Sequence, residues 1–91
     1  MVKIIWSDLA VDDLKSIHDY ISKDSSRYAD DMIERILQIV DQLETYPKSG
    51  RKVPEFKNES IRELILGNYR IVYLIKENSI SISRIHHRQN R

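Results

Sequence analysis

Residues 61–76, IRELILGNYRIVYLIK, decide the fold that we predict for this chain. The stretch reads as two strands joined by a tight turn, because β-branched and aromatic side chains fill both halves and Gly67-Asn68 tolerates the positive φ of a two-residue hairpin loop. Alternation along the second strand separates two faces, one with Tyr69, Ile71, Tyr73 and Ile75 and the other with Arg70, Val72 and Leu74. Because this strand is apolar on both faces except at Arg70, both faces need cover, and we expect it at the centre of a sheet.

Two helices are predicted before the hairpin. A stripe of apolar residues at Ala10, Leu14, Ile17 and Ile21 follows Ser7, a suitable N-cap, and predicts a helix of about four turns. A longer stripe follows Ser25 and Ser26, either of which can cap it, and Pro47 ends it. This second stripe consists of Ala29, Ile33, Ile36, Leu37, Val40 and Leu43. The short connection makes the pair an antiparallel helical hairpin.

Further strands are predicted at the two ends of the chain. Residues 2–6 (VKIIW) form a short β-branched and aromatic run, and isoleucines alternate with serines in residues 79–85. Residues 48–60 read as a loop with at most a short extended piece at 52–54. The predicted fold is therefore α+β, with an N-terminal strand, the helical hairpin and a three-stranded antiparallel meander.

Both helices are expected on one face of this mostly antiparallel sheet. The other face would carry some or all of Arg62, Leu64, Arg70, Val72 and Leu74. An uncovered face that is both apolar and basic indicates a partner.

Length and composition bound the class of protein. The 91 residues make one domain, residues 1–91, and a composition of 41% apolar and 32% charged residues is that of a soluble globular protein. No run approaches the roughly 18 apolar residues of a membrane span. The absence of Cys fits a reducing compartment, so we expect a cytoplasmic protein without membrane contact.

Charge is divided unevenly along the chain. Residues 1–47 carry 5 Lys and Arg against 10 Asp and Glu, whereas residues 48–91 carry 10 against 4, although the net charge is only +1. A basic second half can present a surface to an anionic partner, such as nucleic acid or an acidic protein segment. Two solvated surfaces can also differ in sign without any function.

Arg70 and the two consecutive histidines are the residues from which chemistry could arise. Arg70 either pairs structurally, for instance with Glu63 across the hairpin, or clamps an anion on the open face. His86 and His87 point to opposite faces of a regular strand and cannot chelate one ion, and no Cys is present, so we expect neither a metal nor a cofactor. One of the two could be a general acid or base, although a surface role is the simpler interpretation. The residues alone do not establish an enzyme.

The order and spacing of several motifs resemble the RelE/ParE superfamily of toxins from type II toxin–antitoxin modules. These motifs cover nearly the whole chain: W-S-xx-A-xx-DL-xx-I-xx-YI at 6–21, GR at 50–51, VPE at 53–55, IREL at 61–64, YRIVY at 69–73 and I-x-I-xx-I at 80–85. The resemblance implies a helical hairpin packed on an antiparallel sheet. It also implies a cognate antitoxin that wraps the toxin in a hetero-oligomer.

The superfamily contains two activities. RelE-like members cleave mRNA on the ribosome, and this resemblance implies a phosphate clamp of Arg62 and Arg70 with His87 as acid or base. ParE-like members poison DNA gyrase without a catalytic site. The chain departs from RelE where that family has catalytic lysines, since residues 61–63 read Ile-Arg-Glu, and no Tyr follows Tyr73. These departures favour the ParE-like branch.

For the ParE-like branch, the residues expected to face the target or the antitoxin are basic or titratable. They are Arg51, Arg62, Arg70, His87, Arg88 and Arg91. Two alternatives stay open: an mRNA endoribonuclease of the RelE kind, and an inactive homologue that still binds antitoxin.

Overall fold

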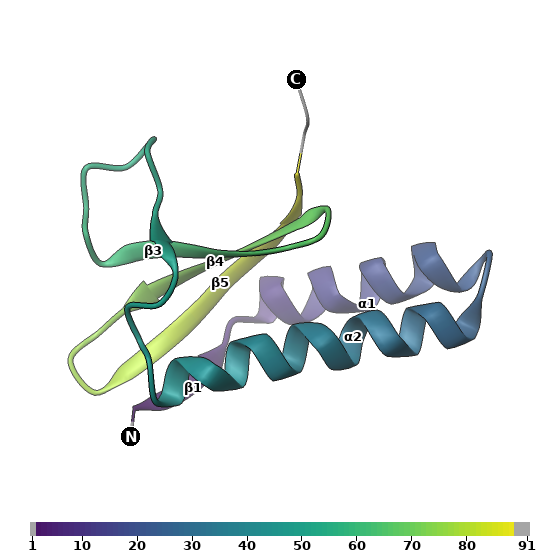
Figure 1. The fold of residues 1–91 in the computed structure, drawn as a ribbon, viewed down its shortest axis with the longest axis horizontal. Coiled ribbons are helices and arrows are strands. Elements are labelled where there is room, and N and C mark those ends of the chain that lie inside the picture. Colours follow the sequence, from purple (N-terminus) through teal and green to yellow (C-terminus); the bar gives the residue numbers. More distant parts are fainter. Residues whose placement is uncertain (1, 89–91) are drawn as a thin grey trace.

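The computed structural model describes residues 2–88 of the chain. Its elements follow in the order β1 (Lys3–Trp6), α1 (Asp8–Ser22), α2 (Ser26–Asp41), the 3-10 helix η1 (Gln42–Glu44), β2 (Arg51–Lys52), β3 (Ile61–Leu66), β4 (Tyr69–Ile75) and β5 (Ser79–His87). The strands form one five-stranded sheet in the order β1-β5-β4-β3-β2, and both helices lie along one side of it (Figure 1). The predicted α+β class, with its helical hairpin, is confirmed.

Serine side chains begin both helices. The Ser7 hydroxyl accepts a hydrogen bond from the Ala10 N–H at 3.0 Å, and the Ser25 hydroxyl accepts one from the Tyr28 N–H at 3.1 Å. These bonds satisfy backbone donors that have no partner inside the helix. The second helix ends at Asp41, and the chain continues as η1 before it reaches Pro47. Within the predicted stripe, Leu37 is an exception because it is 41% exposed.

The sheet is mixed. The predicted three-stranded antiparallel meander is confirmed as β3, β4 and β5, whereas the first strand pairs in parallel and the sheet is not fully antiparallel. β1 pairs with β5 in parallel, from Lys3 beside Ser79 to Trp6 beside Ile82. Parallel strands need a long connection between them, and the helices and the other strands supply it here. A fifth strand was also missed, because the two residues of β2 pair with β3 where the sequence indicated a loop.

The core fills the space between the helices and the sheet. Isoleucines of β4 and β5 meet Ala10, Ile36, Val40 and Leu43 from the helical side, and Ile71, Ile80 and Ile82 are fully buried. No helix within the described residues is long and apolar enough to cross a bilayer. The β3–β4 turn places Gly67 at φ +56°, and no other residue within 2–88 has a positive φ, so Asn68 keeps an ordinary backbone.

The pairing of β3 with β4 decides which side chains face away from the helices. Leu64 lies beside Ile71 and Arg62 beside Tyr73, so both belong to the helix-covered side. Glu63 lies beside Val72 on the opposite side, where Ile61, Ile65, Arg70 and Leu74 also lie. Alternation along β4 correctly separated its residues into two sets, one for each face of the sheet. Of the five residues expected on the open face in whole or in part, Arg70, Val72 and Leu74 lie there. Arg62 and Leu64 do not, because alternation alone does not say which set of β3 meets the helices.

Candidate functional site

A groove of about 420 Å³ lies on the open face, the side of the sheet away from the helices. β4 and β5 form its base. The segment between β2 and β3, which stands away from the helices in Figure 1, contributes Glu55 and Phe56 as one wall. The lining combines apolar side chains, those of Ile61 from β3 and of Val72 and Leu74, with the basic side chains of Arg70, Arg84 and His86. We call this the open-face groove.

Glu63 is a buried charge at the edge of this face. Its side chain is 1% exposed, and its Oε2 accepts a hydrogen bond of 2.6 Å from the Nε of Arg51. Its Oε1 lies 2.6 Å from Nη2 of Arg70. A second carboxylate, that of Glu55, has Oε2 at 3.5 Å from Nη1 of Arg70. A carboxylate buried this deeply requires charged partners, because an unpaired charge away from water is strongly destabilising. The structural pairing of Arg70 with Glu63 is therefore confirmed.

Arg62 is directed to a different place and holds the loop before β2. Its Nη1 donates hydrogen bonds to the carbonyl oxygens of Gly50 at 2.9 Å and Lys48 at 3.4 Å. Next to it on β4, the Tyr73 hydroxyl donates to the Pro47 carbonyl at 2.8 Å and accepts from the Gly50 N–H at 2.9 Å. Burial raises the pKa of Tyr73, so the phenol stays protonated and can donate. Arg62 therefore stabilises the backbone in this structure.

Gly50 is required at this loop by close packing. A Cβ atom at Gly50 would lie 2.5 Å from the Tyr73 hydroxyl and 2.7 Å from the backbone oxygen of Glu63. The tyrosine is fully buried, so it has little room to move away. The glycine lets the loop approach β3 and β4, and this approach brings Arg51 to Glu63.

The two histidines point to opposite sides, as predicted, and each has a distinct neighbour. His86 lies beside Arg70 in the β4–β5 pairing and lines the open-face groove. His87 lies beside Tyr69, and the two rings meet edge to face with centroids 5.4 Å apart at 86°. His87 also lines a separate hollow with Tyr20 of α1. Sequence reasoning chose His87 for the site, whereas His86 is the one that shares a face with Arg70.

An irregularity in β5 explains why His86, and not His87, shares a face with Arg70. The pairing shifts between Val72 and Tyr73, which lie beside Arg84 and Ile82, so Ser83 has no partner on β4. Beyond this bulge Ile85 is buried. The spacing of the buried isoleucines, two residues from Ile80 to Ile82 and then three to Ile85, is the signal in the sequence that could have revealed the bulge.

Arg84 is bound by a carboxylate of α1. Its Nε and Nη2 donate to the two oxygens of Asp13 at 2.9 and 3.1 Å, and the Ile85 N–H donates to the same carboxylate at 2.8 Å. Burial raises the pKa of Asp13, but these hydrogen bonds and the charge of Arg84 outweigh it, so the pKa lies below its ordinary value. This pairing fixes α1 to the part of β5 that β1 does not reach.

The remaining predicted residues are spread along the sheet. The side chain of Arg51 is 61% exposed at the outer strand. Arg88 is half-buried at the end of the described chain. Arg91 lies outside the described residues. Arg62, Arg70 and His87, the three residues expected in a ribonuclease site, are not brought together, because they are bound to a loop, to Glu63 and to Tyr69 respectively.

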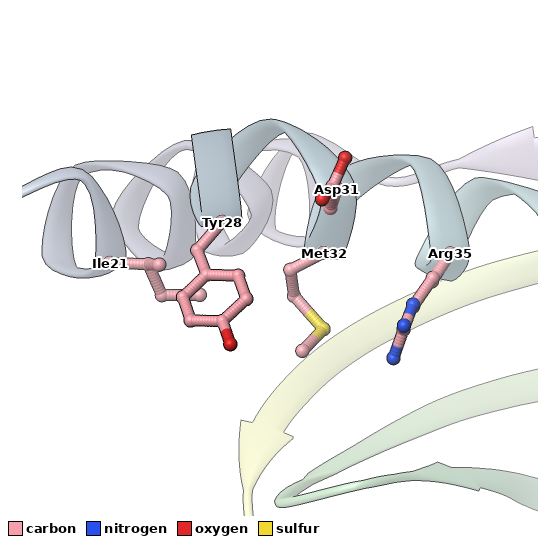
Figure 2. A pocket seen from close by; sticks show the side chains of 5 residues that line it. All are labelled: Ile21, Tyr28, Asp31, Met32 and Arg35. Carbon is pink, nitrogen blue, oxygen red and sulfur yellow. The ribbon is translucent and has the colours of Figure 1, made fainter. Parts of the chain in front are cut away.

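A further hollow lies on the helical hairpin, away from the open-face groove. It has a volume of about 220 Å³ and is lined by Ile21, Tyr28, Asp31, Met32 and Arg35. Figure 2 shows Tyr28, Met32 and Arg35 pointing from α2 to one side, while Asp31 points away. This hollow is mainly apolar, and nothing in it resembles an acid–base pair. Within residues 2–88, no three His, Asp or Glu side chains are grouped so that they could hold a metal ion.

Sequence comparison finds a matching family and a similar protein, and each match covers nearly the full chain. The profile of the family described as the ParE toxin of the type II toxin–antitoxin system parDE matches residues 4–91. Toxin RelE2 of Caulobacter vibrioides is 33% identical over 88 residues, which are 96% of each protein.

Solved structures share the fold. A chain of the chromosomal ParDE system from P. aeruginosa superposes with a TM-score of 0.81 at 24% identity and covers 98% of both chains. The YoeB dimer of Staphylococcus aureus gives 0.64 at 17% identity, with 99% of this chain and 98% of that chain covered. The RelB–RelE complex of Methanococcus jannaschii gives 0.60 at 19% identity, with 91% and 88% covered. At these identities the likeness establishes the fold alone.

Proposed function

This chain belongs to the ParE toxin family of type II toxin–antitoxin systems, and we propose that it inhibits DNA gyrase and carries no catalytic site of its own. Gyrase is the target that the likeness to ParE implies. Support for this mode of action comes from the contacts that the arginines and histidines of the second half of the chain make.

The main support for this proposal is that Arg62, Arg70 and His87, the three candidate ribonuclease residues, lie apart from one another. Phosphate clamping needs cations whose donors are free to meet the anion, and proton transfer needs an acid or base within hydrogen-bond reach of the same group. Arg70 is paired with Glu63, and Arg62 donates to backbone carbonyls. His87 lies on the other side of the sheet from Arg70. This arrangement is better suited to binding a protein than to cleaving RNA.

We also propose that the cognate antitoxin covers the open-face groove. Two structural neighbours are named as toxin–antitoxin assemblies, ParDE and RelB–RelE. The groove offers half-buried Ile61 and Leu74 for apolar side chains, and it has polar groups at its rim. An extended or helical segment with apolar anchors could lie along such a surface. The resulting complex would be a toxin–antitoxin hetero-oligomer.

Two assays on the purified protein, run side by side, test the proposal. One measures DNA supercoiling by gyrase, and the other measures mRNA cleavage on translating ribosomes. We expect inhibited supercoiling with trapped DNA breaks and intact mRNA. Normal supercoiling would contradict the proposal, whatever happens to the mRNA.

A ribosome-dependent ribonuclease is the second candidate, and the name of a relative favours it. Toxin RelE2 of Caulobacter vibrioides is 33% identical to this chain. In this case, codon-phased cuts would appear in the mRNA, and Arg70→Ala would slow cleavage by more than about tenfold, the effect of losing one charge-stabilising group. Silence in both assays, with antitoxin binding retained, would indicate an inactive homologue.

A further inference from the structure

We propose that Glu63 is a built-in counter-anion that keeps Arg51 and Arg70 from binding phosphate, so that the open-face groove accepts protein and rejects RNA. Glu63 is thus a positioning residue that determines ligand class through two arginines. The inference rests on the proposed function only in taking this groove as the partner-binding surface.

The carboxylate of Glu63 lies between the guanidinium groups of Arg51 and Arg70. Each oxygen of Glu63 lies 2.6 Å from a guanidinium nitrogen, one of Arg51 and one of Arg70. Arginine binds carboxylates and phosphates through the same planar set of donors, so the two anions compete for the same position. The Glu63 side chain is 1% exposed, and the contact with Arg70 is the better shielded from competing water, because the Arg70 side chain is 27% exposed and that of Arg51 is 61% exposed.

Three adjacent strands build this cluster. Arg51 lies on β2, directly beside Glu63 of β3, and Arg70 lies on the neighbouring β4. Without the carboxylate, two guanidinium groups would stand close together on one face and would repel each other. Within residues 2–88, Oε1 of Glu63 and Nε of Arg70 are buried without a hydrogen-bond partner, so charge attraction over 2.6 Å, and not an aligned hydrogen bond, joins Glu63 to Arg70. The carboxylate therefore fixes both side chains as well as neutralising them.

Further carboxylates lie beside the arginines that line the groove. Arg70 has a second carboxylate nearby, that of the exposed Glu55. Arg84 is held by Asp13. A groove in the basic half of the chain is thus lined by cations that already have anionic partners. Nucleic-acid binding depends on cations that can replace the counterions of phosphates, and Arg51, Arg70 and Arg84 each have a carboxylate already paired with the guanidinium group.

Glu63→Gln tests this inference, since it removes the charge and keeps the shape. The measurement is the affinity for a short fluorescently labelled single-stranded RNA over a range of salt concentrations. We expect binding at low salt at least about tenfold tighter than in the wild type. The slope of log affinity against log salt should steepen by about 0.7 for each arginine released to a phosphate, or about 1.4 for both.

Two further variants separate charge from structure. Glu63→Asp shortens the side chain but keeps the anion, so its RNA affinity should stay near that of the wild type. The double variant Glu63→Gln with Arg70→Gln should lose most of the gain. A purely structural role for Glu63 would give equal gains in the Gln and Asp variants, and that result would overturn the proposal.

Arg51→Gln in the otherwise unchanged chain covers the case in which the Glu63 variants do not fold. Arg51 is already engaged by Glu63, so its removal should leave the weak RNA binding of the wild type unchanged. A fall of more than about threefold, the contribution of roughly one phosphate contact, would overturn the proposal. A folded Glu63→Gln protein with wild-type affinity and slope would also overturn it. RNA affinity is read independently of gyrase inhibition, so this inference and the proposed function can fail separately.

Discussion

The helix-covered face and the open face of the same sheet satisfy their side chains in different ways. On the covered face, Ile71, Tyr73 and Ile82 are fully buried by the chain's own helices and loop. On the open face, Val72 and Leu74 stay half-exposed, and the arginines among them are paired with carboxylates. The difference indicates that folding alone buries the side chains of the covered face, whereas the open face keeps exposed apolar surface that a partner can cover.

The largest expected difference between the two faces is in stability. Ile82→Ala removes a fully buried side chain from the covered face, and we expect it to lower the free energy of unfolding by about 2–5 kcal/mol. Leu74→Ala, its match on the half-exposed open face, should lower it by only about 1 kcal/mol. Urea denaturation of the two variants measures both values. Equal losses would mean that the open face is as tightly packed as the covered one.

Gly50→Ala tests whether the loop before β2 is held by the covered face. The new methyl group would meet the Tyr73 hydroxyl and the Glu63 backbone, and we expect a loss of about 1–3 kcal/mol from overpacking. The neighbouring Ser49 is exposed, so Ser49→Ala should change stability by less than about 0.5 kcal/mol. If Gly50→Ala has the unfolding midpoint of the wild type, the loop does not depend on this contact.

An effect that depends on pH is expected at the contact between α1 and β5. Asp13 has a folded pKa below its ordinary value of 3.8, so its pairing stabilises the protein above that pH, and this contribution is lost as the pH falls through the folded pKa. Asp13→Asn should lower the free energy of unfolding by about 1.5–3 kcal/mol at pH 7, the range for hydrogen bonds to a charged group.

The pH dependence of that variant supplies its control. The difference between Asp13→Asn and the wild type should shrink when urea denaturation is repeated below the folded pKa of Asp13. Asp12→Asn changes an exposed carboxylate on the same helix and should alter stability little at either pH. A difference for Asp13→Asn that stays constant with pH would show that packing, and not the charge, is responsible.

Local patterns predicted most of the fold. The cap residues Ser7 and Ser25 and the alternation of Tyr69 to Ile75 depend on near neighbours in the sequence, and all were read correctly. The parallel pairing of β1 with β5 joins the two ends of the chain, and nothing local records it. β2 has only two residues, too few for a periodic signal.

The site was predicted less well because it depends on which face of each strand meets the helices. Pairing of Arg70 with Glu63 followed from the energetic cost of a lone charge in an apolar strand. The choice between His86 and His87 depended on the face to which each is directed, since only His86 lies beside Arg70. The second partner of Glu63, Arg51, comes from a strand that the sequence did not reveal, so the bridged cluster was visible only in three dimensions.

Substituting one residue in the open-face groove tests most directly whether this face is the one that binds partners. Leu74→Arg places a long charged side chain in the groove, and Leu37→Arg places the same side chain at an exposed site on α2. The measurement is the concentration that half-inhibits gyrase supercoiling, with antitoxin affinity and thermal unfolding measured on the same samples. We expect a folded Leu74→Arg protein that is more than about tenfold weaker in both, as for disruption of a binding hot spot, and a Leu37→Arg protein that matches the wild type. A folded Leu74→Arg protein that inhibits gyrase and binds antitoxin like the wild type would contradict the account.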